Sequence, residues 1–473
     1  MKRSKKLYIL LGVLVMACIA TLAVTQIEER KEQIKNSGET ILELSGESIQ
    51  SLSWEYNDES LSFHKDEVWL YDGDENFPVS TDKMNELLKQ FQPLSAAFVI
   101  ENVADYGQYG LDDPVCTINL STAEQSYEIK LGDFSKMDSQ RYVSIGDGNV
   151  YLVQNDPLDK FDAVLSDLVA HDEMPDFDHV TRIQFSGTEN YTVTYEEESS
   201  DTYCADDVYF AQYEGKALPL DTSKVESYLR GITNLNPTNY VSYNVTDEEL
   251  QTYGLDAPKL TITVDYTSEE DGKETANSFT LHITPDPEAS QAAEKSNEEE
   301  QDEEIKAYIR VGESQIVYEI SSDKRAALTA VSYNDLRHTE VLWADFSDVQ
   351  QVDISLEGDR YTLTAQEDGK DRTWFYHEAE VEIADLQKAL DALTAVDFTN
   401  EKPAQQEEIS LTVHLDNEHF PEVQIKLYRY DGSRCLAVVD GESVSFVERG
   451  DVVNLVEAVH AIVLEENKSG SNP

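Results

Sequence analysis

The chain is poor in basic residues. Its 473 residues include 36 lysines and arginines against 94 aspartates and glutamates, which gives a formal net charge of −58. Such a surface repels the phosphate backbone of nucleic acids, so the composition argues against nucleic-acid binding. It also repels anionic lipid head groups, so any attachment to a membrane has to be hydrophobic and local.

Cysteine is scarce, and no CxxC pair occurs. Of the four cysteines, Cys18 lies in an apolar N-terminal segment, while Cys116, Cys204 and Cys435 are far apart in the chain. This spacing provides neither a zinc knuckle nor a thioredoxin-like redox pair. The residues around the last three are typical of strands, so we expect buried free thiols in strands.

Catalytic and ligand-binding motifs are also missing. The chain has no GxSxG elbow, no GxGxxG or P-loop signature and no HExxH zinc motif. The string HLDNEH at 414–419 has the wrong spacing for a zinc site, and we interpret it as a strand end with exposed histidines. The segments 72–76 and 146–149 lack the spacing of a calcium loop and are typical of hairpin turns. The sequence therefore predicts no catalytic residue, no cofactor and no metal ligand.

The one long apolar run lies near the start of the chain. After the basic flank MKRSKK (1–6), an uncharged segment extends from Leu7 to Val24, and its length is at the short end of the ~17–25 residues that span a bilayer core. The flank favours a cytoplasmic N-terminus. We therefore expect a single-pass anchor in the cell membrane, in contact with the lipid bilayer through Leu7–Val24, with the rest of the chain extracytoplasmic. Two alternatives stay open: a cleaved signal peptide, and a lipoprotein acylated at Cys18.

One hexapeptide occurs twice, as YGLDDP at 109–114 and YGLDAP at 253–258. Before the first copy, FPVSTDKMNELLKQF matches LPLDTSKVESYLRGI before the second, and each predicts a turn followed by an amphipathic helix. Alternating apolar residues after each copy predict a strand, and the similar segments 141–153 and 307–320 indicate hairpins. The apolar helix positions are Met84, Leu87, Leu88 and Phe91 in the first copy and Val225, Tyr228, Leu229 and Ile232 in the second.

We interpret the repeated hexapeptide as a structural turn. Its glycine can adopt a conformation closed to other residues, its proline restricts the entry into the next strand, and its aspartate can bond to the turn backbone, while tyrosine and leucine can pack onto the sheet. A metal ligand or base at Asp112 or Asp256 is the weaker alternative, because no histidine or second carboxylate repeats beside it. The predicted turn residues are Tyr109, Gly110, Leu111, Asp112 and Pro114, together with Tyr253, Gly254, Leu255, Asp256 and Pro258.

These repeats predict an α+β fold of tandem antiparallel-sheet modules, each with one amphipathic helix, preceded by the transmembrane helix. Alternating rather than continuous apolar runs favour antiparallel sheets. A third copy is fainter, because NEKPAQQEE at 400–408 takes the place of the hexapeptide, and this leaves the shape of that copy open. We expect module 1 at 41–165, module 2 at 176–330, a divergent module 3 at 345–465, a disordered acidic insertion at 285–306 and a disordered tail at 466–473.

The apolar segment, the turn-to-helix step and both hexapeptides together resemble the DUF4340 family, a bacterial family named for its unknown function. The resemblance covers most of residues 41–330. It implies a membrane-anchored protein encoded beside ABC-2-type transporter subunits and a gliding-motility-like protein. It implies no catalytic residues.

The leading hypothesis is therefore a membrane-anchored, extracytoplasmic, non-enzymatic accessory or scaffold protein of an ABC-type export system, with transporter subunits as its partner. Two alternatives from other classes stay open. One is a cell-envelope hydrolase of glycan or peptide that uses dispersed carboxylates. The other is a surface protein that binds cations or another ligand through its many acidic residues.

Overall fold

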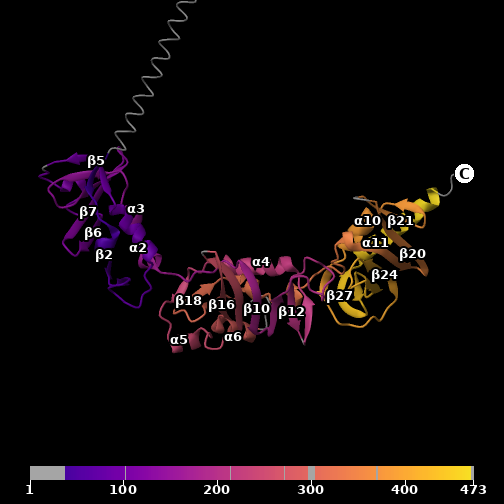
Figure 1. The fold of residues 1–473 in the computed structure, drawn as a ribbon. Helices are drawn as coiled ribbons and strands as arrows, with labels where there is room; N and C mark the ends of the chain where they lie inside the picture. Colours follow the sequence, from indigo (N-terminus) through magenta and orange to yellow (C-terminus); the bar gives the residue numbers. More distant parts are fainter. Residues whose placement is uncertain are drawn as a thin grey trace, which may run out of the picture. The chain divides into compact units, whose positions relative to one another are not determined.

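The computed structural model of the chain describes residues 38–101, 103–213, 215–270, 272–296, 304–368 and 371–469 (Figure 1). The predicted basic flank and the predicted anchor Leu7–Val24 lie outside these residues. Within the described ranges, no helix is both long enough and apolar enough to cross a membrane.

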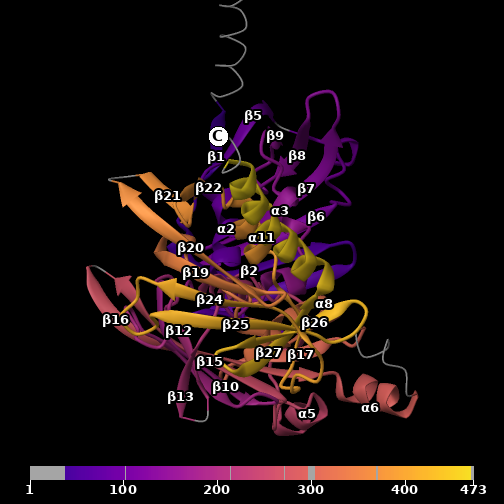
Figure 2. The ribbon, with the colours of Figure 1, turned by 90° about the vertical axis from the view of Figure 1, so that its right-hand side faces the viewer.

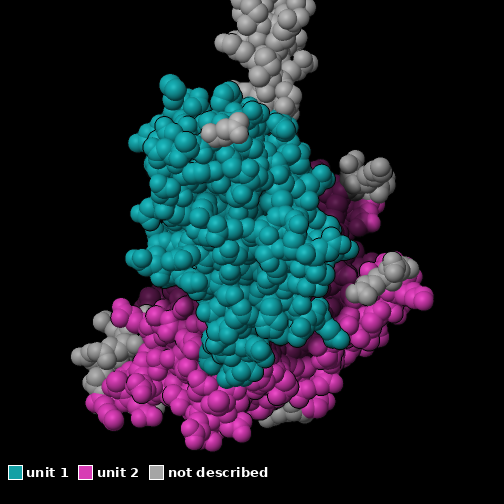
Figure 3. All heavy atoms as spheres, turned by 90° about the vertical axis from the view of Figure 1, so that its left-hand side faces the viewer, with its two compact units in different colours: residues 1–172, 242–244 teal, residues 173–241, 245–473 magenta. Residues whose placement is uncertain are grey.

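The described residues form an α+β fold with three antiparallel sheets of nine strands each and few helices. This confirms the predicted fold class apart from the anchor. The chain divides into two compact units, which Figure 3 distinguishes by colour: unit 1 is residues 1–172 with Ser242–Asn244, and unit 2 is the remainder. Below, modules 1, 2 and 3 denote the predicted ranges that hold the three sheets, and their limits stay predictions.

The first sheet has the strand order β1-β5-β9-β8-β7-β6-β2-β3-β4. Its strands are β1 Glu39–Leu42, β2 Ile49–Tyr56, β3 Glu59–Lys65, β4 Trp69–Tyr71, β5 Leu94–Ile100, β6 Cys116–Thr122, β7 Ser126–Ser135, β8 Gln140–Ser144 and β9 Val150–Val153. The helices around it are η1 Gly46–Ser48, α2 Thr81–Leu88, η2 Lys89–Phe91, η3 Gly107–Tyr109, α3 Leu158–Phe161 and η4 Leu165–Leu168.

The second sheet has the order β13-β12-β11-β10-β15-β16-β17-β18-β14. Its strands are β10 His179–Gly187, β11 Tyr191–Tyr195, β12 Tyr209–Tyr213, β13 Lys216–Pro219, β14 Tyr240–Ser242, β15 Leu260–Glu270, β16 Lys273–Pro285, β17 Ala307–Val311 and β18 Val317–Ile320. Its helices are α4 Thr222–Thr233, α5 Asp247–Thr252, α6 Pro287–Ser296, α8 Ser322–Thr329 and α9 Tyr333–Leu336. Helix α4 lies on one side of the strands, and α5 and α6 lie on the other (Figure 1).

The third sheet has the order β22-β21-β20-β19-β24-β25-β26-β27-β23. Its strands are β19 Val349–Leu356, β20 Asp359–Asp368, β21 Asp371–Tyr376, β22 Ala379–Val381, β23 Ala395–Phe398, β24 Glu407–Leu415, β25 Glu422–Arg429, β26 Arg434–Val439 and β27 Glu442–Glu448. The helices are η5 Phe346–Asp348, α10 Ala384–Asp391 and the long C-terminal α11 Arg449–Ser469, which Figure 2 shows in yellow.

The three sheets are variants of one topology. A first meander of strands is followed by a helix, and a second meander of four strands completes the sheet. The first strands of the two meanders pair at its centre: β2 with β6, β10 with β15 and β19 with β24. Each of these pairs has a register irregularity at the same place, after Ile49, Val180 and Val349. The second and third sheets have the same order throughout, so module 3 has the topology of module 2.

Periodicity explains why the helices form where they do. All eight apolar helix positions predicted in the first two modules are buried. Helix α2 begins after Ser80, whose side chain accepts a hydrogen bond from the Lys83 amide, and α4 begins after Asp221, which accepts from the Ser223 and Lys224 amides. Such caps satisfy backbone donors at a helix start. The amphipathic-helix prediction is therefore confirmed for these two modules.

One local expectation is wrong, and helices occupy the described parts of two segments that were expected to be disordered. Cys116 and Cys435 are buried in strands, but Cys204 lies in a turn before β12 and is only partly buried. Helix α6 occupies Pro287–Ser296, where a disordered insertion was expected; residues 297–303 lie outside the described part of the chain. Helix α11 continues to Ser469 and so includes the first residues of the expected tail. Helix α6 was not predicted because its apolar positions are few.

Candidate functional site

The first hexapeptide closes a short helical segment in unit 1. Gly110 follows η3 with a φ of 68°, in the left-handed region that glycine adopts without strain. The Gly110 amide donates to the Gly107 carbonyl at 3.1 Å, and the Leu111 amide donates to the Tyr106 carbonyl at 3.1 Å. These two bonds form the Schellman motif, which satisfies the last carbonyls of a helix. Leu111 is buried.

The second hexapeptide repeats this geometry after α5 in unit 2. Gly254 has a φ of 67°. Its amide donates to the Gln251 carbonyl at 3.1 Å, and the amide of the buried Leu255 donates to the Leu250 carbonyl at 2.8 Å. The Thr284 hydroxyl on β16 donates to the Gly254 carbonyl at 2.9 Å and so fixes the turn to the sheet. Both glycines therefore hold a helix C-cap.

The tyrosines of the two turns make the same contact. The Tyr109 ring lies 5.0 Å from the Tyr142 ring on β8, and the Tyr253 ring lies 4.7 Å from the Tyr308 ring on β17. In module 2 this contact belongs to a small apolar cluster on the side of the sheet opposite α4. Its members are Val245, Leu255 and Val317, with the partly buried Leu250, Tyr253 and Tyr308.

The other turn residues have smaller roles. Pro114 and Pro258 lie just before β6 and β15, as the restricted entry into a strand predicts. The expected backbone contacts of Asp112 and Asp256 are not seen, since neither carboxylate accepts a hydrogen bond from the turn in the described part of the chain. Among the described residues, neither aspartate belongs to a group of three or more His, Cys, Asp or Glu side chains that could hold a metal ion.

The two histidines of the metal-like string HLDNEH lie in different elements. His414 lies on β24, and its Nε2 is 2.9 Å from Asp353 Oδ2 on β19. His419 lies in the loop that follows β24, where its amide bonds to Asn417. Across the described ranges, no group of three or more His, Cys, Asp or Glu side chains converges as a metal ion requires.

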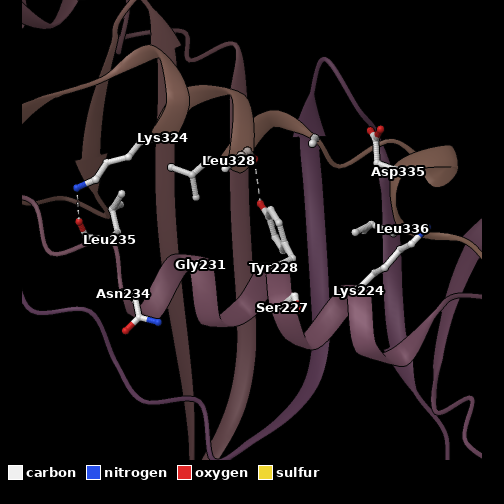
Figure 4. Close-up of a pocket in the computed structure, with 12 residues that line it drawn as sticks. Lys224, Ser227, Tyr228, Gly231, Asn234, Leu235, Lys324, Leu328, Asp335 and Leu336 are labelled. Carbon is white, nitrogen blue, oxygen red and sulfur yellow. Dashed lines mark hydrogen bonds between the residues drawn. The ribbon is translucent and has the colours of Figure 1, made fainter.

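A largely apolar pocket of unit 2 lies between α4 and α8 (Figure 4). We call it the α4–α8 groove; its volume is about 560 Å³, within the ~300–1,000 Å³ usual for small-molecule sites. Tyr228, Leu235 and Leu328 form apolar walls, and Gly231 leaves part of the α4 side open. Lys224 and Lys324 line opposite ends in Figure 4. This groove was not predicted from the sequence, because Tyr228 is its one lining residue among the predicted apolar helix positions, and it was expected only in the core.

A second group of contacts joins module 2 to module 3 within unit 2. Tyr203, in the segment between β11 and β12, belongs to the core cluster of the third sheet and is 6% exposed. Its ring stacks at 4.6 Å on Trp343, in the segment that connects the two modules, and meets the Phe420 ring of module 3 at 5.9 Å. An aromatic side chain from one module thus completes the core of the next.

Asp207 lies at the centre of this inter-module joint and is 3% exposed. It accepts hydrogen bonds from the Thr202 hydroxyl at 2.6 Å and from the Trp343 indole N–H at 3.2 Å. Its Oδ1 is 2.8 Å from His338 Nε2, and His338 Nδ1 is 3.9 Å from a carboxylate oxygen of Glu340. The partners are more than 130 residues apart in sequence, at 131 and 136 positions for His338 and Trp343, which is why no local motif indicated them.

A pocket of about 440 Å³ opens beside this joint. Cys204, Glu340, Trp343 and Asp391 are among its lining residues. Burial raises the pKa of the Cys204 thiol to about 11, so the thiol is protonated at neutral pH and is a poor nucleophile. Burial, and then the negative charge of Glu340, raise the pKa of Asp391.

The comparison with known families identifies the chain. The sequence model of the family described as "Domain of unknown function (DUF4340)" matches residues 69–258 and again residues 211–412. The chain belongs to the DUF4340 family. The two matches begin in β4 and β12, which hold the same place in the topology of their sheets, so this DUF4340 protein carries the family pattern twice, shifted by one module. No curated protein and no solved structure matches the chain.

Proposed function

We propose that this DUF4340 protein is a membrane-anchored, extracytoplasmic, non-enzymatic accessory or scaffold protein of an ABC-type export system. The observation that carries the proposal is the repetition of one sheet topology in which the recurring side chains are helix caps, turn glycines and core residues. Repetition of a structural unit is typical of proteins that present an extended binding surface. The apolar segment Leu7–Val24 supports attachment to the membrane.

The inter-module joint supports a scaffold role. Tyr203, Trp343 and Asp207 tie modules 2 and 3 together through a shared core and through hydrogen bonds to the buried Asp207 carboxylate. Because a buried polar network is costly to break, these modules resist independent movement. A fixed pair of modules can bind a partner at two points at once. Two modules on a flexible linker bind the second point more weakly, because the linker loses entropy when both are engaged.

The proposal is tested by crosslinking the full-length chain in its native membrane and identifying what is captured. We expect an ATPase or permease subunit of an ABC-type transporter, and we expect less capture from the Tyr203→Ala variant, which loosens the joint. Tyr213→Ala is the matched control, because Tyr213 is an exposed tyrosine on β12. Capture of no membrane-protein partner by the wild-type chain contradicts the proposal.

A cell-envelope hydrolase is the second candidate, and one observation favours it. Asp391, whose pKa is raised, lines the pocket beside the joint together with Glu340 and the Trp343 ring. Glycosidases use a pair of carboxyl groups of which one has a raised pKa, and an aromatic wall suits a sugar. Release of soluble fragments from purified peptidoglycan that is lost in Asp391→Asn and in Glu340→Gln supports this candidate. No release by the wild-type chain eliminates it.

A further inference from the structure

Three polar side chains of the α4–α8 groove already donate to backbone carbonyls. The Tyr228 hydroxyl donates to the Leu328 carbonyl at 3.1 Å, the contact drawn as a dashed line in Figure 4. The Lys324 ammonium donates to the Leu235 carbonyl at 2.8 Å, and that of Lys224 donates to the Arg337 carbonyl at 2.8 Å. An occupant with many polar groups, such as a peptide backbone, would lose its bonds to water without replacement. A hydrocarbon chain makes no hydrogen bonds to water and therefore loses none on entering the groove.

The ends of the groove are unusual for so acidic a protein. Its charged lining residues are Lys224, Lys324 and Asp335, although acids outnumber bases by 94 to 36 in the chain. A lysine ammonium has three donors, so each of these two retains N–H groups after bonding one carbonyl. Asp335 lies toward the Lys224 end in Figure 4, and Lys324 lies at the opposite end. The Lys324 end is therefore the better place for an anionic head group.

Gly231 gives independent evidence that the groove is kept open. It lies in α4, where glycine weakens a helix relative to alanine. Its φ is not in the left-handed region, and a Cβ built there would meet no atom within 4 Å. Neither the backbone nor close packing requires glycine at this position. The missing side chain does leave space on the α4 side of the groove unfilled.

The corresponding groove of module 3 has a different character. It lies between α10 and α11 and has a volume of about 540 Å³. Alanines line it, and Ala392 takes the place that Gly231 has in module 2. Its charged lining residues are Asp385, Glu457 and Lys388, so acids outnumber bases there. An anionic head group is repelled from this groove and attracted to that of module 2.

We propose that the α4–α8 groove binds a single-chain anionic amphiphile, with the acyl chain over Gly231 and with its carboxylate or phosphate head at Lys324. A fatty acid and a lysophospholipid share this chemistry. The proposal goes beyond the accessory function and does not depend on it, because binding is defined by the groove alone. A helical partner segment is disfavoured, since the groove is too small for a helix ~10–12 Å across and offers its backbone few bonds.

Photolabelling of the full chain in phosphatidylcholine nanodiscs tests the proposal. The probe is dodecanoate with a terminal diazirine, and mass spectrometry identifies the labelled peptides. We expect saturable labelling within residues 224–235 or 324–336. Unlabelled dodecanoate should compete well and dodecylamine poorly, because the two have similar hydrocarbon chains but head groups of opposite charge. Labelling elsewhere only, or equal competition by the amine, overturns the proposal.

Matched variants sharpen the experiment. Gly231→Phe should reduce labelling at least about tenfold, because the ring takes the space of the acyl chain, while the Cβ that carries it meets no atom within 4 Å. Gly231→Ala should keep most of the labelling, and Ala392→Phe in the module 3 groove should leave it unchanged. Lys324→Gln should weaken competition by dodecanoate more than by dodecylamine. Undiminished labelling of a folded Gly231→Phe variant overturns the proposal.

Two further arms separate the sources of the ligand. Competition by lauroyl lysophosphatidylglycerol, tested beside dodecanoate, distinguishes a lysophospholipid from a free fatty acid, and failure of both overturns the proposal. A photoreactive amino acid in place of Ala327, on the α8 side of the groove, then reports what occupies the site in cells. A crosslinked lipid supports the proposal, and a crosslinked polypeptide overturns it.

Discussion

Modules 2 and 3 share one strand order but differ in what covers the far side of the sheet. In module 2 the side opposite α4 is covered by α5 and the hexapeptide turn, with Leu255 buried and Tyr253 against Tyr308. In module 3 the hexapeptide is absent, and Leu436, Val438 and Phe446 pack with the partly buried Tyr428 and Tyr430 instead. The Arg434 guanidinium lies 5.0 Å from the Phe446 ring and 5.4 Å from that of Tyr430.

The difference teaches that the hexapeptide does not determine the topology. Strand alternation and one apolar helix face are common to both modules, and they are sufficient for the shared strand order. The hexapeptide instead ends a helix and covers an apolar patch that would otherwise face water. Module 3 covers the equivalent patch with aromatic side chains and with a guanidinium that makes cation–π contacts to them. These side chains take the place of the helix and the turn of module 2. The turn is thus a local cover, and its loss is compatible with the fold.

The inter-module joint gives the largest expected effect. Tyr203→Ala removes a buried ring from the core of module 3, and the loss should be about 3–5 kcal/mol of unfolding free energy. Although Tyr203 belongs to module 2 in sequence, we expect faster amide exchange in β19 and β24 as well as in β12. Hydrogen exchange followed by mass spectrometry on the full chain measures this.

The control for that prediction is Tyr213→Ala, an exposed tyrosine in the same strand region whose removal should change stability by less than about 0.5 kcal/mol. A Tyr203→Ala chain in which only module 2 exchanges faster would mean that the two modules do not share a core. The comparison of modules 2 and 3 as coupled units would then fail.

The turn glycines give the next largest effect. Gly254→Val places a β-branched residue in the left-handed region, and its Cβ would lie 2.9 Å from Thr284 Cγ2. We expect a loss of about 2–4 kcal/mol, with faster amide exchange in β15 and β16. Gly110→Val should act likewise in module 1, because its Cβ would lie 2.9 Å from the Asp133 backbone nitrogen.

Module 3 provides the control for the glycine variants. Gly441 has a φ of 87°, but a Cβ there meets no atom within 4 Å, so Gly441→Val carries backbone strain without the packing clash. The excess destabilisation of Gly254→Val over Gly441→Val measures how tightly the turn packs on the sheet. If both variants lose the same free energy of unfolding, the hexapeptide glycine is needed only for its left-handed backbone conformation and not for close packing on the sheet.

These residues also explain how far the sequence could predict the structure. The helix faces of α2 and α4 and the strand pairs were predictable, because their periodicities of 3.6 and 2 are local signals. The joint was not, because Asp207 and Trp343 are 136 residues apart and each stands in an unremarkable segment. One residue in the sequence indicated the α4–α8 groove. Gly231 interrupts a pattern that otherwise predicts a helix, and helix propensity does not explain a glycine there.

Gly231→Ala should produce a smaller effect of opposite sign. It gives the α4–α8 groove the residue type of the module 3 groove, and it should stabilise α4 by about 0.5–1 kcal/mol. Slower amide exchange in α4 is the measurement. Gly432→Ala, at a turn glycine with no atom within 4 Å of the added Cβ, controls for the general stiffening of the unfolded chain. A destabilised Gly231→Ala variant would show that the glycine has a structural role after all.

The smallest expected effect concerns pH and the β25–β26 turn of module 3. The Ser433 amide, and then the Arg434 amide, bond to the Asp431 carboxylate and hold its pKa at about 2. Because the folded pKa lies below the unfolded value of ~3.9, this contribution is complete above the unfolded pKa and is lost as the pH falls through the folded one. Asp431 is partly exposed, with 37% of its side-chain surface accessible, so solvent screening keeps the contribution small.

The corresponding connection of module 2 runs from β16 through α6 and contains no such turn in its described part, so the pH response should be specific to module 3. Between pH 5 and pH 2, amide exchange at the β25–β26 turn should rise more in the wild-type chain than in Asp431→Asn, which has no charge to lose. Carbon-13 NMR of labelled aspartate gives the pKa directly. If Asp431 titrates near ~3.9, the amide bonds do not favour the charged form, and the turn is then held by Arg434 and its aromatic neighbours alone.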